Sequence, residues 1–298
     1  MKVAVIDIGS NTVKIKVFDC INNYPKEVFS EIKNSKLISY IENGVLSETG
    51  IILLCNNILE LKNAAERFGY DIFACFATAS LRRTSNIDEI KKAIYSFCNV
   101  EIDLISGEEE AFLSFSGVKN TTENFPDDTV LFDMGGGSTE IILSKNKEIC
   151  LSKSMDFGSL SMYLDFPDND FEGIKNKAVE HLKGVSITPI TSKNAVLVGG
   201  TALSINALFL HFFPEEKPFF MTIDKLKTLY ETLKKYDDNV IKLLKEKTPH
   251  RVTTVIPGLS SYIGMLEYCK TENVFVSTSG IREGYVTEKI LKNLEKYK

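Results

Sequence analysis

Two stretches of the sequence decide the fold: VAVIDIGSNTVKIKV at residues 3–17 and TVLFDMGGGSTEIIL at residues 129–143. Each stretch is an apolar run that ends in an aspartate, followed by a turn of small residues and a second run rich in β-forming residues. This order is typical of a β-hairpin. The sequence therefore contains a low-copy internal repeat, and it predicts two related hairpins far apart along the chain.

The repeat extends to polar positions. A shift of 126 positions places one stretch on the other and makes these pairs: Asp7 with Asp133, Gly9 with Gly135, Thr12 with Ser138, and Ile15 with Ile141. An ordinary hairpin is one interpretation, because glycine and asparagine form turns in many settings. A shared aspartate and hydroxyl are not needed to turn a chain, so the repeat favours ligand-binding tips. Turn amides and the hydroxyl can wrap a phosphate, and the aspartate can hold a metal or a water.

The rest of the chain alternates strand-like and helix-like segments, which predicts two α/β domains with a ligand between them. The polar stretch TTENFPDD (residues 121–128) is the best candidate linker. The further predicted strands are 25–33, 71–77, 101–105, 147–155, 195–199 and 273–277. The predicted helices are 47–69, 86–98, 107–118, 170–183, 201–212, 222–235, 237–247, 257–269 and one that starts near 281.

Composition excludes several classes of protein. The 298 residues carry a formal net charge of −5, which argues against a broad nucleic-acid-binding face. No apolar run approaches the ~18 residues of a membrane span, and Asp7 interrupts any signal-peptide core. The six cysteines contain no C-x-x-C pair and the three histidines show no metal-ligand spacing, so free thiols and no zinc site are predicted. We therefore expect a cytoplasmic protein that contacts neither nucleic acid nor membrane.

Four more segments place small or charged residues where a helix begins, and helix-start amides bind anions readily. They are ATASLRR (77–83), ISGEEEAFLSFSGV (105–118), VGGTALSINAL (198–208) and STSGIREGYV (277–286). Structural interpretations remain open for each. Acidic residues 108–110 favour the helix dipole, Ser106 with Glu109 fits a capping box, and Arg82 with Arg83 fits a solvated strand end.

Taken together, the motifs resemble the exopolyphosphatase / guanosine pentaphosphate phosphohydrolase family. The resemblance covers residues 3–286, and D-x-G-G-G-S-T-E combined with I-S-G-x-E-E-A is its most specific part. The motifs, in family order, are D-x-G-S-N-T (7–12), A-T-A-S-L-R (77–82), I-S-G-E-E-E-A (105–111), D-x-G-G-G-S-T-E (133–140), G-G-T (199–201), R-x5-P-G (251–258) and S-G-I-R-E-G (279–284).

The resemblance implies two actin-like (ribonuclease H-like) α/β domains with the active site in the cleft between them. The first would span 1–121 and the second 122–284, with the helix at 285–298 packing back onto the first. The implied reaction is hydrolysis of the terminal phosphate of inorganic polyphosphate or guanosine pentaphosphate. The implied cofactor is Mg²⁺, with K⁺ as a candidate activator, and the implied assembly is a homodimer.

Site residues carry over position by position. Glu110 would activate the attacking water, Glu140 would be a second essential carboxylate, and Arg82 would contact phosphate. Asp7, Asp133 and Glu140 would hold the metal, and carboxylates converging on one site would repel one another without a cation. The phosphate-binding positions would be Gly9, Ser10, Asn11, Thr12, Gly135, Gly136, Gly137, Ser138, Gly200, Thr201, Arg251 and Arg282. Lys14 and Arg83 are further basic groups that could line the substrate path.

The sequence departs from the family at Arg83, Thr84 and Thr253, where the family often has Asp, Ala and Asp. The extra C-terminal helical domains of longer members lie outside the sequence, which favours short polyphosphates or the nucleotide as substrate. Three alternatives stay open: a phosphatase specific for guanosine pentaphosphate, an ATP-dependent small-molecule kinase of the same fold, and a non-catalytic polyphosphate or nucleotide sensor.

Overall fold

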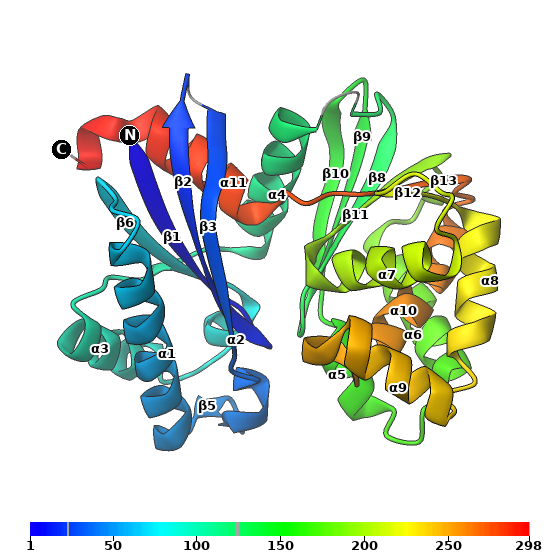
Figure 1. Cartoon of the computed structure of the whole chain (residues 1–298), viewed down its shortest axis with the longest axis horizontal. Helices are drawn as coiled ribbons and strands as arrows, with labels where there is room; N and C mark the ends of the chain where they lie inside the picture. Colours follow the sequence, from blue (N-terminus) through cyan, green and yellow to red (C-terminus); the bar gives the residue numbers. More distant parts are fainter. Residues whose placement is uncertain (23, 123–124, 298) are drawn as a thin grey trace. The chain divides into compact units, whose positions relative to one another are not determined.

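The computed structural model describes residues 1–22, 24–122 and 125–297, and it divides the chain into two compact units (Figure 1). Unit 1 comprises Met1–Gly117 and Ile281–Lys298, and unit 2 comprises Val118–Gly280. The unit boundaries fall at 117/118 and 280/281, a few residues before the predicted 121/122 and 284/285. The predicted linker at 121–128 includes Glu123 and Asn124, which lie outside the described residues.

Unit 1 is built on a five-stranded sheet with the order β3-β2-β1-β6-β7. The first three strands form an antiparallel meander, and β6 and β7 add in parallel beyond β1. The predicted strand at 101–105 is reduced to two residues. The strands are β1 (Lys2–Ile8), β2 (Thr12–Ile21), β3 (Tyr24–Asn34), β6 (Ile72–Ala77) and β7 (Asp103–Leu104).

Helices cover both faces of this sheet, because successive side chains of a strand point to opposite sides. Ala4, Ile6 and Ile8 of β1 pack toward helices α1 (Glu48–Glu66) and α3 (Ile87–Cys98). Val3 and Val5 pack on the other face, with helix α4 and the C-terminal segment. The remaining elements of unit 1 are η1 (Leu37–Tyr40), β4 (Ile41–Glu42), β5 (Val45–Leu46), α2 (Ala79–Arg82), α4 (Gly107–Thr121, which runs on into unit 2), α11 (Ile281–Gly284), the π-helical turn η3 (Tyr285–Ile290) and η4 (Leu291–Tyr297).

Unit 2 repeats the same plan in a six-stranded sheet with the order β10-β9-β8-β11-β13-β12. Three antiparallel strands are again followed by two parallel ones, and β12 is an addition at the edge. The strands are β8 (Thr129–Met134), β9 (Thr139–Lys145), β10 (Glu148–Met155), β11 (Asn194–Val198), β12 (Phe220–Thr222) and β13 (Asn273–Val276). The helices are α5 (Ser159–Asp165), α6 (Phe171–Val185), α7 (Gly199–Phe212), α8 (Ile223–Leu233), α9 (Asp238–Lys247), η2 (Pro249–Arg251) and α10 (Val255–Tyr268).

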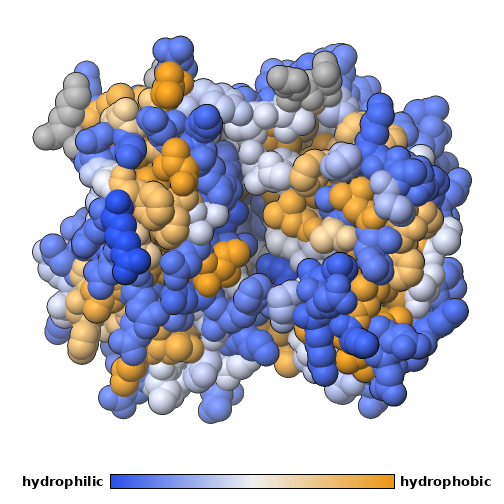
Figure 2. Space-filling model, viewed as in Figure 1, coloured by the Kyte–Doolittle hydropathy of each residue, from blue (hydrophilic) through white to orange (hydrophobic). Residues whose placement is uncertain are grey.

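The surface and the thiols are ordinary for a globular chain. On the face in view, hydrophobic residues form separate patches among hydrophilic ones in each unit (Figure 2). All six cysteines are free, as predicted. Among the described residues, every helix is too short or too polar to cross a membrane.

Candidate active site

The two predicted hairpins form, and their turns close in the same way. In unit 1 the amide of Gly9 donates to the carbonyl of Thr12 at 3.0 Å. In unit 2 the amide of Gly135 donates to the carbonyl of Ser138 at 2.9 Å. These are the positions that the 126-residue shift pairs, so the sequence repeat is also a repeat of backbone geometry.

The segment that follows β3 binds the tip of the unit 1 hairpin through backbone hydrogen bonds. The carbonyl of Asn11 accepts hydrogen bonds from the amides of Ser35 (3.0 Å) and Lys36 (2.8 Å). The side chains of Ser10, Asn11 and Thr12 are all buried. A tip fixed in this way presents a preformed backbone to a ligand.

Helix α5 holds the tip of the unit 2 hairpin. The carbonyl of Gly135 accepts from the amide of Ser159, and that of Gly136 accepts from the amides of Leu160 and Ser161. The approach requires a glycine at 158, because a Cβ there would lie 2.5 Å from the carbonyl carbon of Gly136. The sequence did not predict α5, so this support was missed.

A row of polar residues crosses the antiparallel strands of unit 2. Asp133 of β8 lies opposite Glu140 of β9, and Glu140 lies opposite Ser154 of β10. Glu140 is only 1% exposed, and the hydroxyl of Ser154 donates to its Oε1 at 2.8 Å. Both predicted metal ligands of unit 2 therefore lie side by side, with a positioning hydroxyl behind Glu140.

In unit 1 the equivalent row begins with a different pair. Asp7 lies opposite Lys14, which occupies the position of Glu140 in the repeat. The Oδ2 of Asp7 lies 3.6 Å from Nη1 of Arg282 on α11. The structure thus pairs Asp7, a predicted metal ligand, with Arg282, a predicted phosphate ligand.

Glu110 lies in the first turn of α4 and is only 8% exposed. Its Oε2 accepts a hydrogen bond from Nη1 of Arg82 at 3.1 Å. The same Nη1 donates to the carbonyl of Ile105 at 2.9 Å, just before α4 begins. The structure therefore brings together the two catalytic residues of unit 1 that the sequence predicted. Arg83, at the end of α2, is exposed.

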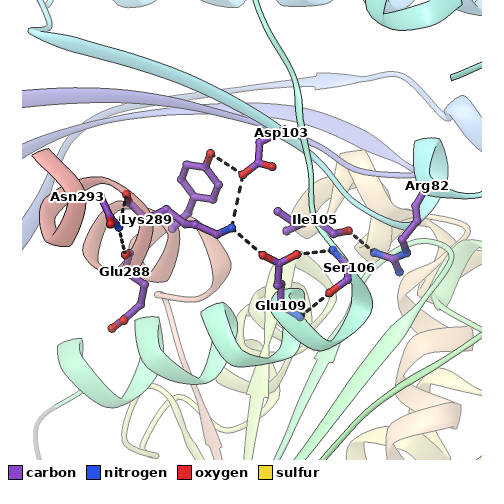
Figure 3. A network of polar contacts seen from close by, with 9 residues as sticks. Arg82, Asp103, Ile105, Ser106, Glu109, Glu288, Lys289 and Asn293 are labelled. Atoms are coloured by element: carbon purple, nitrogen blue, oxygen red, sulfur yellow. Dashed lines mark hydrogen bonds and ion pairs between the residues drawn. The ribbon is translucent and has the colours of Figure 1, made fainter. Parts of the chain in front are cut away.

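The capping-box interpretation of the acidic run is also confirmed. The amide of Ser106 donates to Oε2 of Glu109 at 3.0 Å, and the amide of Glu109 donates back to Oγ of Ser106 at 3.1 Å (Figure 3). Glu109 and Glu110 therefore have different roles, although they are neighbours in the sequence. Glu109 closes the helix N-terminus, and Glu110 faces an arginine.

The start of α7 forms a corner in unit 2 with the groups that could bind an anion. Gly199 has φ +94°, and a Cβ on it would lie 3.1 Å from Oδ1 of Asp133. A Cβ on Gly200 would lie 2.2 Å from Nη2 of Arg251. The guanidinium donates from Nη1 to Oγ1 of Thr201 at 3.3 Å, and burial lowers the pKa of Arg251 to about 10. The arginine thus stays charged at neutral pH beside the helix N-terminus, as an anion site requires.

Two more residues of this corner, Tyr262 and Ser159, were not predicted from the sequence. The hydroxyl of Tyr262, on α10, donates to the carbonyl of Val198, and Oγ1 of Thr201 donates to Oγ of Ser159. Burial, and then the charge of Asp133, raise the pKa of Tyr262 well above its usual value. The tyrosine therefore acts as a neutral donor under the β11–α7 turn.

Magnesium would find suitable donors in unit 2. Within the described residues, no group of three or more His, Cys, Asp or Glu side chains is arranged to hold a metal ion. Mg²⁺ does not need such a group, because it is usually bound by one or two carboxylates together with substrate phosphates and water. The adjacent carboxylates of Asp133 and Glu140 meet that requirement.

The duplicated sheet order places the chain in the actin-like class of two-domain α/β proteins. It is similar to the crystal structure of an exopolyphosphatase from Cytophaga hutchinsonii, with a TM-score of 0.85 and 19% identity over 97% of this chain and 99% of that one. This likeness confirms the predicted fold class. The model of the Ppx/GppA phosphatase family matches residues 17–293. The chain belongs to the Ppx/GppA phosphatase family.

Two curated relatives are similar along most of the chain. A bifunctional 3-dehydroquinate synthase/phosphatase of Fusobacterium nucleatum is 23% identical over 96% of this chain and 46% of its own length. A guanosine-5'-triphosphate,3'-diphosphate pyrophosphatase of Pseudoalteromonas translucida is 25% identical over 94% of this chain and 58% of its own length. The chain thus spans about half the length of these relatives.

Proposed function

We propose that the protein releases terminal orthophosphate from a phosphoanhydride chain, either inorganic polyphosphate or guanosine pentaphosphate. The observation that carries this proposal is the buried Glu110 held against Arg82 at the first turn of α4. A carboxylate in that setting can accept a proton from water, and a neighbouring guanidinium can neutralise a phosphate. Family membership and the names of the relatives support the same reaction class.

In this proposal the residues of the two units have different roles. Glu110 orients and deprotonates the attacking water, and Arg82 exchanges its carboxylate partner for a substrate oxygen. The hairpin tips and the corner of Gly200, Thr201 and Arg251 bind phosphate oxygens. Phosphoryl transfer needs positioning and charge stabilisation above all, and fixed amides and arginines supply both. The proposal therefore requires that residues of both units bind the same substrate molecule.

Asp133 and Glu140 would hold Mg²⁺, and Asp7 would join them if it exchanged Arg282 for the metal. When bound, Mg²⁺ would neutralise phosphate charge and help to orient the terminal group. Arg282, released from Asp7, would then bind phosphate. K⁺ activation, a homodimer and a cytoplasmic location belong to the same proposal.

The first prediction concerns the base. Glu110→Gln keeps the size of the side chain and its hydrogen bond to Arg82 but cannot accept the proton. We expect the rate of phosphate release to fall by about 10²–10⁴-fold, with an unchanged circular dichroism spectrum. Phosphate release by this variant at the wild-type rate would contradict the assignment of Glu110.

Side-by-side kinetics of the wild-type protein on medium-chain polyphosphate and guanosine pentaphosphate, with Mg²⁺ present, identify the substrate. Transfer of phosphate from ATP to an acceptor, without hydrolysis of either substrate, would establish the kinase alternative. Tight binding of either polyanion without phosphate release would establish the sensor.

A further inference from the structure

We propose that Lys289 is a positioning residue for Glu110, acting through Glu109 at the N-terminus of α4. This inference rests on the proposed function for its catalytic consequence. Its structural part concerns unit 1 alone, and Figure 3 shows the network that carries it.

Glu109 uses its two carboxylate oxygens for two different partners. Oε2 accepts from the amide of Ser106 and completes the capping box, whereas Oε1 accepts from Nζ of Lys289 at 2.7 Å. The hydrogen bond from Lys289 is the largest cause that lowers the pKa of Glu109. Lys289 therefore holds the capping carboxylate in its charged, oriented form from a segment 180 positions away.

The element that carries Lys289 has further anchors, and Nζ of Lys289 itself also lies 3.9 Å from Oδ2 of Asp103. The element is a π-helical turn. This form is rare in proteins, and where it occurs it is often at a functional site. The hydroxyl of Tyr285 in this turn donates to Oδ2 of Asp103 at 3.0 Å, and its ring stacks on Phe76. Asn293 caps the turn by donating to the carbonyls of Glu288 and Lys289. The ammonium group is thus presented from a fixed backbone.

The C-terminal segment meets α4 along one face of that helix. Lys289 binds Glu109, and Glu288 accepts from Oγ of Ser116 at 2.7 Å. Between them, Gly284 packs so closely that a Cβ would lie 1.8 Å from the carbonyl oxygen of Leu113. Positions 109, 113 and 116 follow the spacing of one helix face.

Glu110 lies one residue, and about 100° of helical rotation, away from that face. Its orientation toward Arg82 therefore depends on how firmly the first turn of α4 is held. The side chains of Glu109 and Lys289 are each partly exposed, so solvent screens their ion pair and limits its contribution to overall stability. Its consequence is geometric, since small misplacements of a catalytic group reduce turnover strongly.

The test replaces Lys289 with methionine, which keeps most of the side-chain length and removes the charge. We expect kcat for phosphate release to fall by about ten-fold or more while KM changes little, because other residues bind the phosphates. Lys289→Arg, which retains the positive charge, should keep most of the wild-type kcat. The kcat of a Lys289→Met, Glu109→Gln double variant should be no lower than that of the slower single variant, because both changes break the same ion pair between Lys289 and Glu109.

Lys292→Met is the matched control, because Lys292 pairs with Glu288 on the same segment and is well exposed. It should leave kcat unchanged. An unchanged kcat for Lys289→Met, or equal losses in Lys289→Met and Lys292→Met, would overturn the proposal.

Hydrogen exchange gives a readout that does not depend on activity. The amides of Ser106 and Glu109 should exchange faster in Lys289→Met than in wild type, since both belong to the capping box. If wild-type protein released no phosphate from either substrate, the proposed function would fall. The exchange rates would still decide whether Lys289 holds the α4 terminus, and unchanged rates would refute it.

Discussion

Glu140 shows how much a single residue of this protein depends on one neighbour. Its carboxylate is almost completely buried on β9, where an ionised group is unfavourable unless hydrogen bonds satisfy it. Ser154 supplies such a bond from the adjacent strand. The hydroxyl therefore fixes the carboxylate beside Asp133 and compensates part of its desolvation.

Ser154→Ala should lower the free energy of unfolding by about 1–3 kcal/mol, because it leaves a buried carboxylate oxygen without that partner. It should also reduce phosphate release. Urea denaturation and kinetics check both effects. Ser152→Ala is the control on the same strand, since its buried hydroxyl has no hydrogen-bond partner among the described residues. Equal effects of the two substitutions would contradict the role of Ser154.

At this scale the sequence pointed to individual residues but not to their partners. It singled out Glu110, Arg82, Asp7 and Arg282 from motifs, but not the two ion pairs that they form. Arg282 reaches Asp7 only because α11 docks on the β1 sheet, and no local pattern encodes that docking. Ser154 could not be placed by counting from the β9–β10 turn either, because the register shifts between Ile149 and Leu151 and puts Ser154, rather than Lys153, opposite Glu140.

Among the elements, α4 is one whose position depends on a glycine of its neighbour. Gly284 lets α11 approach the backbone of α4 at Leu113 more closely than any side chain would permit. The contact lies in the same small core as Val5, Phe76 and Tyr285. The pitch of the segment that follows also changes there, from α-helical to π-helical.

Gly284→Ala should lower the free energy of unfolding by about 1–3 kcal/mol, because the new methyl group would force the two elements apart. Gly184→Ala in α6 is the matched control, since a Cβ there meets nothing within 4 Å. It should stabilise the protein by up to ~1 kcal/mol through reduced chain entropy. Thermal unfolding of both variants checks the prediction, and a neutral Gly284→Ala would contradict it.

The sequence predicted the long elements well because their apolar periodicity is strong. Helices α1, α3, α6 and α9 begin and end within a few residues of the predicted ranges. Short elements such as α5 and β12 were missed, since their few residues carry too little pattern. The predicted helix from residue 281 is confirmed only for its first turn. Its later pitch follows from tertiary anchoring at Asp103 and Glu109.

At the scale of the whole molecule, unit 1 is discontinuous in sequence. Residues 281–298 return to complete the core that β1 and β6 begin, with Tyr285, Val286 and Ile290 against Val5 and Phe76. Unit 2 is a single continuous stretch with its own core around α10. The repeated sheet order was predictable from the repeated hairpins, whereas this return was only suggested by the family resemblance.

A chain that ends after Gly280 should therefore lose the stability of unit 1 selectively. We expect amides of β1 and β6 to exchange rapidly with solvent, because Val5 and Phe76 would be uncovered. Amides of β8 and α10 should keep their protection. Hydrogen exchange with mass spectrometry measures both units in one sample, and unchanged protection of β1 would contradict the prediction.

The late return of residues 281–298 reverses the usual order of events at the ribosome. Domains generally fold from the N-terminus as they are synthesised. Here β1 and β6 emerge with one side of their sheet bare and stay so until residues 281–290 follow, whereas unit 2 lies between these two parts in the sequence and can already be complete. The nascent chain thus exposes the apolar side chains of Val5 and Phe76 until residues 281–290 emerge, and that surface is where a chaperone would be needed.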